Sequence, residues 1–259
     1  MVLLRNEVQP RTFRRAYQGH GASVRHIDLA VIGFLNSFAG ASRAFDIFMV
    51  SIASNNLFKG GPILATIWGL WFARIGANEQ QQRRARIVSI VAAACIAAAL
   101  SVALTQVLPI RPRPLVEPQL DFALPYSMTV GGWERASSLP SDHAAMFFAL
   151  AGGLCMLSTR WGWLAMVHVL LFIAFPRAYL GLHYFSDLVA GAAIGLACVG
   201  IANTRWVLSG FSQRVISSEG RHPGIFYAAA FLISFQMAGL FHESRSLAKS
   251  VKSVIAALW

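Results

Sequence analysis

Three short clusters along the chain combine the side chains that phosphate chemistry needs. The first is Arg111-Pro112-Arg113-Pro114, the second is Pro140-Ser141-Asp142-His143, and the third runs from Arg177 to Asp187 and contains His183. An imidazole serves as a nucleophile or a proton donor near neutral pH, and an arginine guanidinium binds two phosphate oxygens at once. Together the clusters predict a phosphoryl-transfer site built from side chains.

The spacing inside the clusters suggests roles. His183 and Asp187 are four residues apart, so on a helix they would share a face. The carboxylate would then fix the imidazole tautomer and leave the other ring nitrogen as a nucleophile. Ser141 is placed to cap a helix that begins near Asp142, whose first amides would attract an anion. His143, in the first turn of that helix, would donate a proton to a leaving oxygen.

The arginines are expected at the phosphate oxygens. Arg111 and Arg113 lie on a proline-stiffened loop, and Arg177 precedes His183 by six residues. The three cysteines all fall inside apolar stretches, which argues against both a disulfide framework and a zinc site. We therefore expect neither a metal nor a cofactor.

The elements that carry these clusters are apolar. The chain has 259 residues, of which 56% are hydrophobic and 13% charged, with a mean hydropathy of +0.55. Soluble domains carry about a quarter charged residues. An all-α polytopic membrane protein is predicted, a bundle of about six transmembrane helices. Its apolar segments are Gly60–Ala73, Ile87–Leu108, Ala144–Thr159, Trp161–Phe175, Leu188–Thr204 and Gly224–Leu240.

The stretch 28–56 is less clear. It is apolar, but Asn36, Arg43 and Asp46 interrupt it, and Gly40 divides it. A span would need these polar groups to face the protein interior, whereas two short amphipathic helices at the membrane interface fit about as well. We expect an interface-lying or re-entrant start and leave the alternative of a span open.

The net charge of +11 indicates orientation. If the loop 75–86, with its three arginines, lies in the cytoplasm, alternation also places Arg160 and the loop holding Arg205, Arg214 and Arg221 there. The three clusters then fall on the outer side. The excess charge is thus explained by membrane topology and an anion site, and it gives no support to nucleic-acid binding.

The ordered clusters resemble those of the type 2 phosphatidic acid phosphatase (PAP2) superfamily. Its pattern is Lys-x6-Arg-Pro, then Pro-Ser-Gly-His, then Ser-Arg-x5-His-x3-Asp. Here Gln106 stands at the lysine position before Arg113, and Asp142 replaces the glycine. The Pro-Ser-Asp-His form and the interrupted start are similar to bacterial undecaprenyl-diphosphate phosphatases. The first 27 residues and the last apolar segment lie outside the resemblance.

The resemblance implies a mechanism and a place in the cell. His183 would attack phosphorus and form a phosphohistidine, Asp187 would orient it, and His143 would protonate the leaving oxygen and then activate water. A multi-pass protein of a bacterial inner membrane is implied, with its site on the periplasmic side and a lipid phosphate or diphosphate as substrate. Phosphate ligands would be Arg113, Arg177, Ser141 and Asp142, with Arg111 or Gln106 replacing the absent lysine.

Several alternatives stay open. Undecaprenyl diphosphate is the expected substrate, but phosphatidic acid, phosphatidylglycerophosphate and lipid A fit the same residues, as does phosphoryl transfer to another lipid. A non-catalytic membrane binder is favoured only by Gln106. We expect a basic segment (1–27), a catalytic domain (28–204), and a region of loop, extra helix and amphipathic tail (205–259). The oligomeric state is not predicted.

Overall fold

The computed structural model describes residues 22–131, 137–204, 208–242 and 244. This part of the chain is helical and contains no strand. Its elements, in order, are α2 (Ala22–Asn36), α3 (Arg43–Ser54), α4 (Asn56–Phe72), α5 (Ala77–Val107), the 3-10 turn η2 (Pro114–Val116), α6 (Asp142–Leu157), α7 (Thr159–Val169), the π-helical turn η3 (Leu170–Ala174), α8 (Phe175–Tyr179), α9 (Phe185–Ala202), the π-helical turn η4 (Leu208–Ser212), α11 (Gln213–Arg221) and α12 (Pro223–Ala238).

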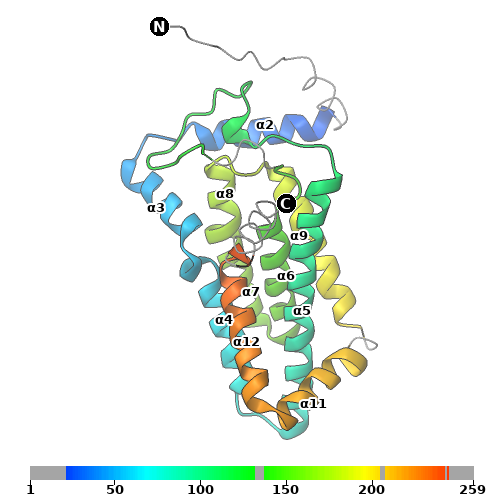
Figure 1. Ribbon diagram of the computed structural model, residues 1–259. Helices are drawn as coiled ribbons and strands as arrows, with labels where there is room; N and C mark the ends of the chain where they lie inside the picture. The colour runs from blue at the N-terminus through cyan, green and yellow to red at the C-terminus, as the bar shows by residue number, and fades with distance from the viewer. Residues whose placement is uncertain (1–21, 132–136, 205–207, 243, 245–259) are drawn as a thin grey trace, which may run out of the picture.

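The long helices form an upright bundle (Figure 1). Within the described residues, three helices are long and apolar enough to cross a membrane: Ala77–Val107, Thr159–Tyr179 and Phe185–Ala202. Asp142–Leu157 and Pro223–Ala238 are shorter apolar helices. The prediction of an all-α membrane fold is confirmed, and each of the six apolar segments falls largely within a helix.

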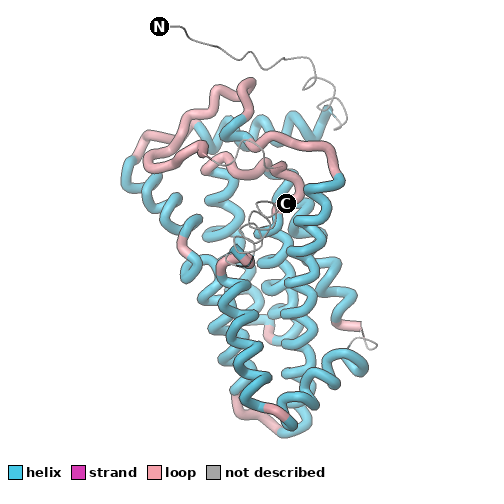
Figure 2. Tube along the Cα trace, in the orientation of Figure 1, coloured by secondary structure: helices cyan, strands magenta, loops and turns pink. Residues whose placement is uncertain are grey.

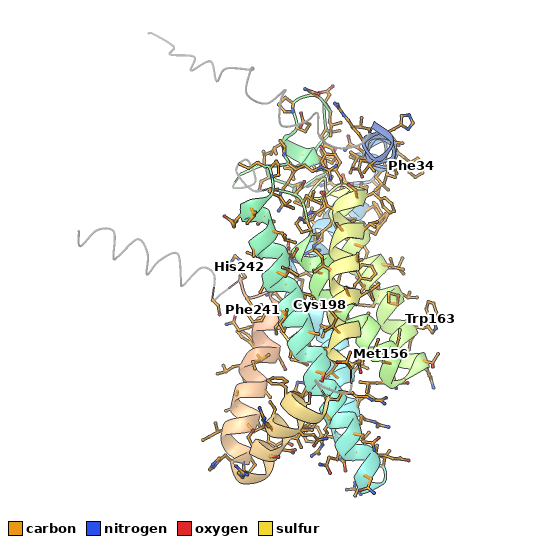
Figure 3. All side chains as sticks on the ribbon, turned by 90° about the vertical axis from the view of Figure 1, so that its right-hand side faces the viewer. Phe34, Met156, Trp163, Cys198, Phe241 and His242 are labelled. Atoms are coloured by element: carbon orange, nitrogen blue, oxygen red, sulfur yellow. The ribbon has the colours of Figure 1, made fainter. Side chains whose placement is uncertain are left out.

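The outer faces of these helices are apolar. Phe34 and Trp163 project away from the bundle (Figure 3) and are 65% and 63% exposed. Ile201 on α9 and Phe231 on α12 are equally exposed. Exposed apolar side chains on helix after helix are unfavourable in water but are the expected surface in lipid.

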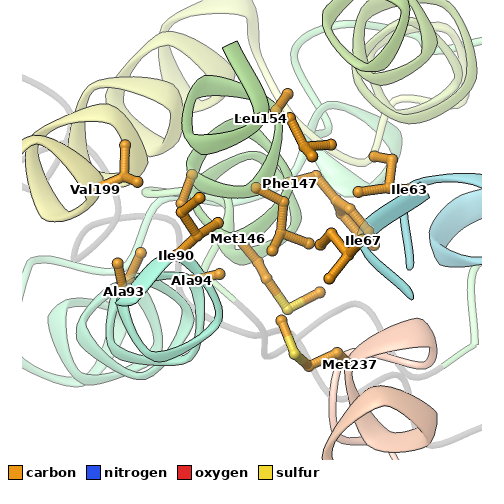
Figure 4. Packing of buried hydrophobic residues seen from close by; sticks show 14 of the residues in the cluster. Ile63, Ile67, Ile90, Ala93, Ala94, Met146, Phe147, Leu154, Val199 and Met237 are labelled. Atoms are coloured by element: carbon orange, nitrogen blue, oxygen red, sulfur yellow. The ribbon is translucent and has the colours of Figure 1, made fainter. Parts of the chain in front are cut away.

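The core centres on α6, which packs against α5, α7 and α9. Figure 4 shows Phe147 of α6 directed toward Ile63 and Ile67 of α4, and Met146 directed toward Met237 of α12. Small residues allow close contact on the other side of α6. At Gly195 of α9, a Cβ atom would come within 2.2 Å of a carbonyl oxygen of α6. Such close approach of small residues is how membrane helices pack.

The two ends of the bundle differ. At one end lie the loops that flank η2 (Figure 2) and helix α2, which runs across the bundle (Figure 1). At the opposite end lie α11 and the start of α5 (Figure 1). The three clusters belong to the first end, and the arginines of segment 75–86 belong to the second.

Two boundaries differ from the sequence-based expectation. Segment 75–86 was expected as a loop, but α5 begins at Ala77 because its glutamines and arginines are strong helix formers without an interrupting Gly or Pro. Helix α2 begins at Ala22, so the expected boundary at residue 27 falls inside a helix. The amphipathic tail that we expect near the C-terminus and most of the basic N-terminal segment lie outside the described residues.

Candidate active site

His183 lies at the centre of the loop end, in the short turn between α8 and α9. Gly181 makes this turn possible: its φ is +67°, and a Cβ there would meet the ring of Phe122 at 2.6 Å. The ring of His183 is buried, and its Nδ1 lies 2.8 Å from the carbonyl oxygen of Ser138. A carbonyl only accepts, so Nδ1 carries the proton and Nε2 presents a lone pair.

The expected hydrogen bond between Asp187 and His183 is not formed, which corrects the sequence-based prediction. Helix α9 begins only at Phe185, so His183 precedes the helix, and its Nδ1 is 3.8 Å from Asp187 Oδ2. The Asp187 carboxylate instead accepts from the backbone N–H of Tyr184 at 2.8 Å and caps α9. The carbonyl of Ser138 therefore orients the imidazole, and Asp187 holds the turn that carries it.

Arg111 also differs from its expected role. Its guanidinium pairs with Asp28 of α2 and Asp187 of α9 at 2.5 Å each, donates to Ser186 Oγ at 2.8 Å, and lies 4.1 Å over the ring of Tyr184. We call Arg111, Asp28, Asp187 and Ser186 the arginine clamp. Burial alone would lower the pKa of Arg111, but the two carboxylates outweigh it and raise that pKa above its usual value. Arg111 thus joins α2 to α9, and its positive charge is already balanced by two carboxylates of the protein.

Arg113 faces the ring of His183. Its Nη1 is 3.3 Å from His183 Nε2 and donates to the carbonyl of Leu182 at 2.6 Å. Burial and the neighbouring positive charge of Arg113 hold the pKa of His183 well below its usual value. The imidazole is therefore neutral at physiological pH, as a nitrogen nucleophile must be.

Arg177 also interacts electrostatically with His183. It sits on α8, is 3% exposed, and donates from Nη1 to the carbonyl of Ile173 at 3.4 Å. Its own carbonyl accepts from the backbone of Leu182 at 2.9 Å and of His183 at 3.3 Å. Arg177 interacts electrostatically with Arg113 and Asp142. It therefore supports the turn through its backbone and adds a second cation beside the two histidines through its side chain.

The second cluster forms the start of α6, as predicted. Ser141 caps the helix, accepting from the N–H of Ala144 at 3.4 Å, and its own N–H donates to the carbonyl of Asp187 at 3.1 Å. Asp142 Oδ1 accepts from the backbone N–H and from Nδ1 of His143, at 2.8 and 2.9 Å. With Nδ1 held by the carboxylate, Nε2 of His143 is the ring nitrogen left available for proton exchange. Asp142 was expected among the phosphate ligands, but in the structure it orients His143.

Gln106 is not brought to the site. It is exposed in the last turn of α5, where its Nε2 donates to Thr105 Oγ1 at 3.2 Å. The site also contains a cation that the sequence-based predictions did not include. Lys59 of α4 is 7% exposed and interacts electrostatically with Arg177, Asp142 and His143. Its position in an apolar helix could have drawn attention to it, because a lysine there is costly unless it has a role.

The arrangement has the parts of a two-histidine phosphoryl-transfer site. A neutral imidazole presents a lone pair, a second imidazole is oriented by a carboxylate, and buried cations lie around both. Residues 86–209, which include all of these except Lys59, match the PAP2 superfamily. This segment, just under half of the chain, is therefore similar to the PAP2 superfamily.

Two curated relatives are also similar to the chain. The chain is 26% identical over 197 residues to a lipid A 1-diphosphate synthase of Escherichia coli, a match that covers 74% of this chain and 79% of that protein. It is 49% identical over 57 residues to a lipid A 4'-phosphatase of Bacteroides thetaiotaomicron, covering 22% of this chain and 25% of that protein.

One solved structure is also similar. It is the crystal structure of a transmembrane PAP2 type phosphatidylglycerolphosphate phosphatase from Bacillus subtilis. The sequence identity is 18% and the TM-score 0.47, and the match covers 78% of this chain and 92% of that one.

Proposed function

We propose that this membrane protein of the PAP2 lipid phosphatase family releases the terminal phosphate of a lipid phosphate or diphosphate through a phosphohistidine on His183. The observation that carries the proposal is the hydrogen bond from His183 Nδ1 to the Ser138 carbonyl. It fixes the proton on one nitrogen and leaves Nε2 as the nucleophile, beside the guanidinium of Arg113. The burial that keeps this ring neutral supports the same role.

The reaction has two steps. In the first, His183 Nε2 forms a bond to phosphorus, the bond from phosphorus to the leaving oxygen breaks, and His143 gives that oxygen a proton. In the second, His143 takes a proton from water, the water oxygen attacks phosphorus, and the P–N bond breaks to release inorganic phosphate. Arg113 and Arg177 stabilise the charge that develops on the phosphoryl oxygens in both steps.

The site is proposed to lie on the outer side of a bacterial inner membrane. The arginines at the start of α5 and on α11 belong to the end of the bundle opposite the site (Figure 1), which fits a cytoplasmic location for that end. A lipid substrate would then enter from the outer leaflet. The orientation is tested with a cysteine placed at Thr129, an exposed position in the loop between η2 and α6: labelling from outside supports it, and labelling only from inside reverses it.

Undecaprenyl diphosphate is the proposed first substrate, because Pro140-Ser141-Asp142-His143 resembles the form of the second motif in undecaprenyl-diphosphate phosphatases. Phosphatidic acid, phosphatidylglycerophosphate and lipid A belong in the same assay. Phosphoryl transfer to a second lipid is the other candidate reaction, favoured by the Escherichia coli relative named as a lipid A 1-diphosphate synthase. Products formed with and without an acceptor lipid separate hydrolysis from transfer.

The test is phosphate release by purified protein in detergent, across these lipid mono- and diphosphates. His183→Ala is expected to abolish turnover, because no other group takes the phosphoryl group, while His222→Ala at an exposed position leaves it unchanged. Retained turnover in His183→Ala would reject the mechanism. EDTA is expected to leave the rate unchanged, since the proposed charge stabilisation comes from arginines, and a strong loss would show that a metal takes part.

A further inference from the structure

Helix α4 lies outside residues 86–209, yet its side chains face the start of α6. Ile63 and Ile67 of α4 pack against Phe147 of α6 (Figure 4). Lys59 precedes Ile63 by one helical turn, and His143 precedes Phe147 by one turn, and the two helices run in the same direction along the bundle (Figure 1). Lys59 is thereby brought to the level of His143, which agrees with the electrostatic interaction between them.

The orientation of Lys59 is fixed by its neighbours. A Cβ on Gly60 would come within 2.7 Å of the Cα of Ala238, so α4 lies directly against α12 at this point. The carbonyl of Lys59 accepts from His168 Nε2 of α7 at 3.2 Å. These contacts hold this turn of α4 from two sides, and the lysine side chain is directed into the bundle, where it is 7% exposed.

Lys59 has no hydrogen bond or ion pair from Nζ to any described residue. Its charged neighbours are Arg177 and Asp142, and Asp142 already accepts twice from His143. Lys59, Arg113 and Arg177 form, with Asp142, what we call the cation cluster. Asp187 of the clamp also interacts electrostatically with Arg113. Counted together among the described residues, the cluster and the clamp hold four cations (Lys59, Arg111, Arg113 and Arg177) and three carboxylates (Asp28, Asp142 and Asp187), so one cation is in excess. Buried charge of one sign is costly unless a partner of the other sign completes it.

We infer that Lys59 is a phosphate-binding residue that contacts the phosphoryl oxygens from the α4 side of the site. The inference rests on the proposed function and extends it. Cations in excess over the carboxylates of the described residues are complementary to a negatively charged phosphoryl group. The occupant is an oxyanion, whether it comes from the lipid headgroup or from free inorganic phosphate. Gln106, by contrast, is exposed and bonded to Thr105, so it does not supply this charge.

The test compares Lys59→Met, which keeps the length of the side chain but removes its charge, with Arg74→Gln just beyond the other end of α4. For Lys59→Met we expect kcat/KM for lipid phosphate to fall about 100-fold. We expect the inhibition constant of inorganic phosphate to rise at least about tenfold, in keeping with the loss of one charge-assisted contact. Lys59→Arg is expected to recover part of both, and Arg74→Gln to match the wild type.

Thermal unfolding separates phosphate binding from a structural role. If Lys59 is needed for the fold, its replacement lowers Tm. If it is a buried cation that serves to bind a ligand, its replacement by methionine leaves Tm unchanged or raises it. Inorganic phosphate is expected to raise the Tm of the wild type and of Arg74→Gln, but not of Lys59→Met. If Lys59→Met does not fold, Lys59→Arg against Lys59→Gln gives the same comparison.

The outcomes distinguish this inference from the function on which it rests. Lys59→Met with wild-type kcat/KM and phosphate inhibition, or an equal Tm response to phosphate in all variants, overturns the role of Lys59. Turnover in His183→Ala overturns the proposed function instead, and the Tm response to phosphate does not depend on turnover. A lipid phosphate that raises Tm where inorganic phosphate does not would assign the site to the lipid headgroup, and the reverse would assign it to free phosphate.

Discussion

The arginine clamp and the cation cluster lie side by side at the loop end of the bundle, and both are buried. In the clamp, Arg111 is bound by two carboxylates and a hydroxyl. In the cation cluster, Lys59, Arg113 and Arg177 all interact electrostatically with Asp142, and Arg113 also interacts with Asp187 of the clamp. The two groups are linked through Asp187, whose backbone carbonyl accepts from the N–H of Ser141 at 3.1 Å.

This difference in charge balance distinguishes two roles of a buried arginine. A guanidinium matched by protein carboxylates is a structural joint, because its hydrogen-bonding capacity is used within the fold. A group of cations in excess over its carboxylates costs stability in the empty protein and gains it when an anion binds. Arg111 and Arg113 are separated by one residue and yet fall on opposite sides of this division.

The largest expected effect is in the cation cluster. Arg177→Gln should lower kcat/KM for lipid phosphate by a factor of about 100 to 1,000, because a buried charge at the developing phosphoryl anion is lost. Its Tm should stay near the wild-type value, since among the described residues the side chain donates to a single carbonyl. Kinetics and thermal unfolding of the same preparation check both points. A large fall in Tm with unchanged kcat/KM would show that Arg177 has a structural role like that of Arg111.

The clamp should respond in the opposite way. Arg111→Gln leaves two carboxylates buried without their cation, so the free energy of unfolding should fall by about 3 kcal/mol. Asp28→Asn added to Arg111→Gln should recover part of that loss, because one unpaired charge is removed. Denaturant unfolding in detergent measures both variants. If the two residues are not coupled, adding Asp28→Asn to Arg111→Gln lowers stability by as much as Asp28→Asn does alone. That result would contradict the prediction.

The smallest effect is expected outside both groups. Gln106→Ala should leave kcat/KM near its wild-type value and should change the free energy of unfolding by no more than about 0.5 kcal/mol, because the residue is exposed at a helix end. The same assays serve, with Arg111→Gln as the comparison. If Gln106→Ala lowers kcat/KM as much as is expected for Arg177→Gln, then Gln106 contacts the substrate and acts together with the cation cluster.

The fold was largely predictable because the properties that define it are local. Apolar runs mark the helices, and Ser141 marks the start of α6. The contacts of the site were less predictable because they depend on tertiary packing. The partner of Arg111 on α2 is 83 residues away, and the acceptor for His183 is a backbone carbonyl, which has no signature in sequence. The spacing of His183 and Asp187 suggested a helical pair, but the helix begins two residues too late to contain it.

The π-helical turn η3 between α7 and α8 makes the position of Arg177 depend on chain length. A π turn holds about one residue more than an α turn, and each residue of an α-helix adds about 100° of rotation. Deleting one residue within 170–174 would restore a uniform helix and rotate the segment after it by that angle. Arg177 would then point away from His183, although no residue of the three motifs had changed. The position of Arg177 therefore depends on the number of residues in this helix as well as on their identity.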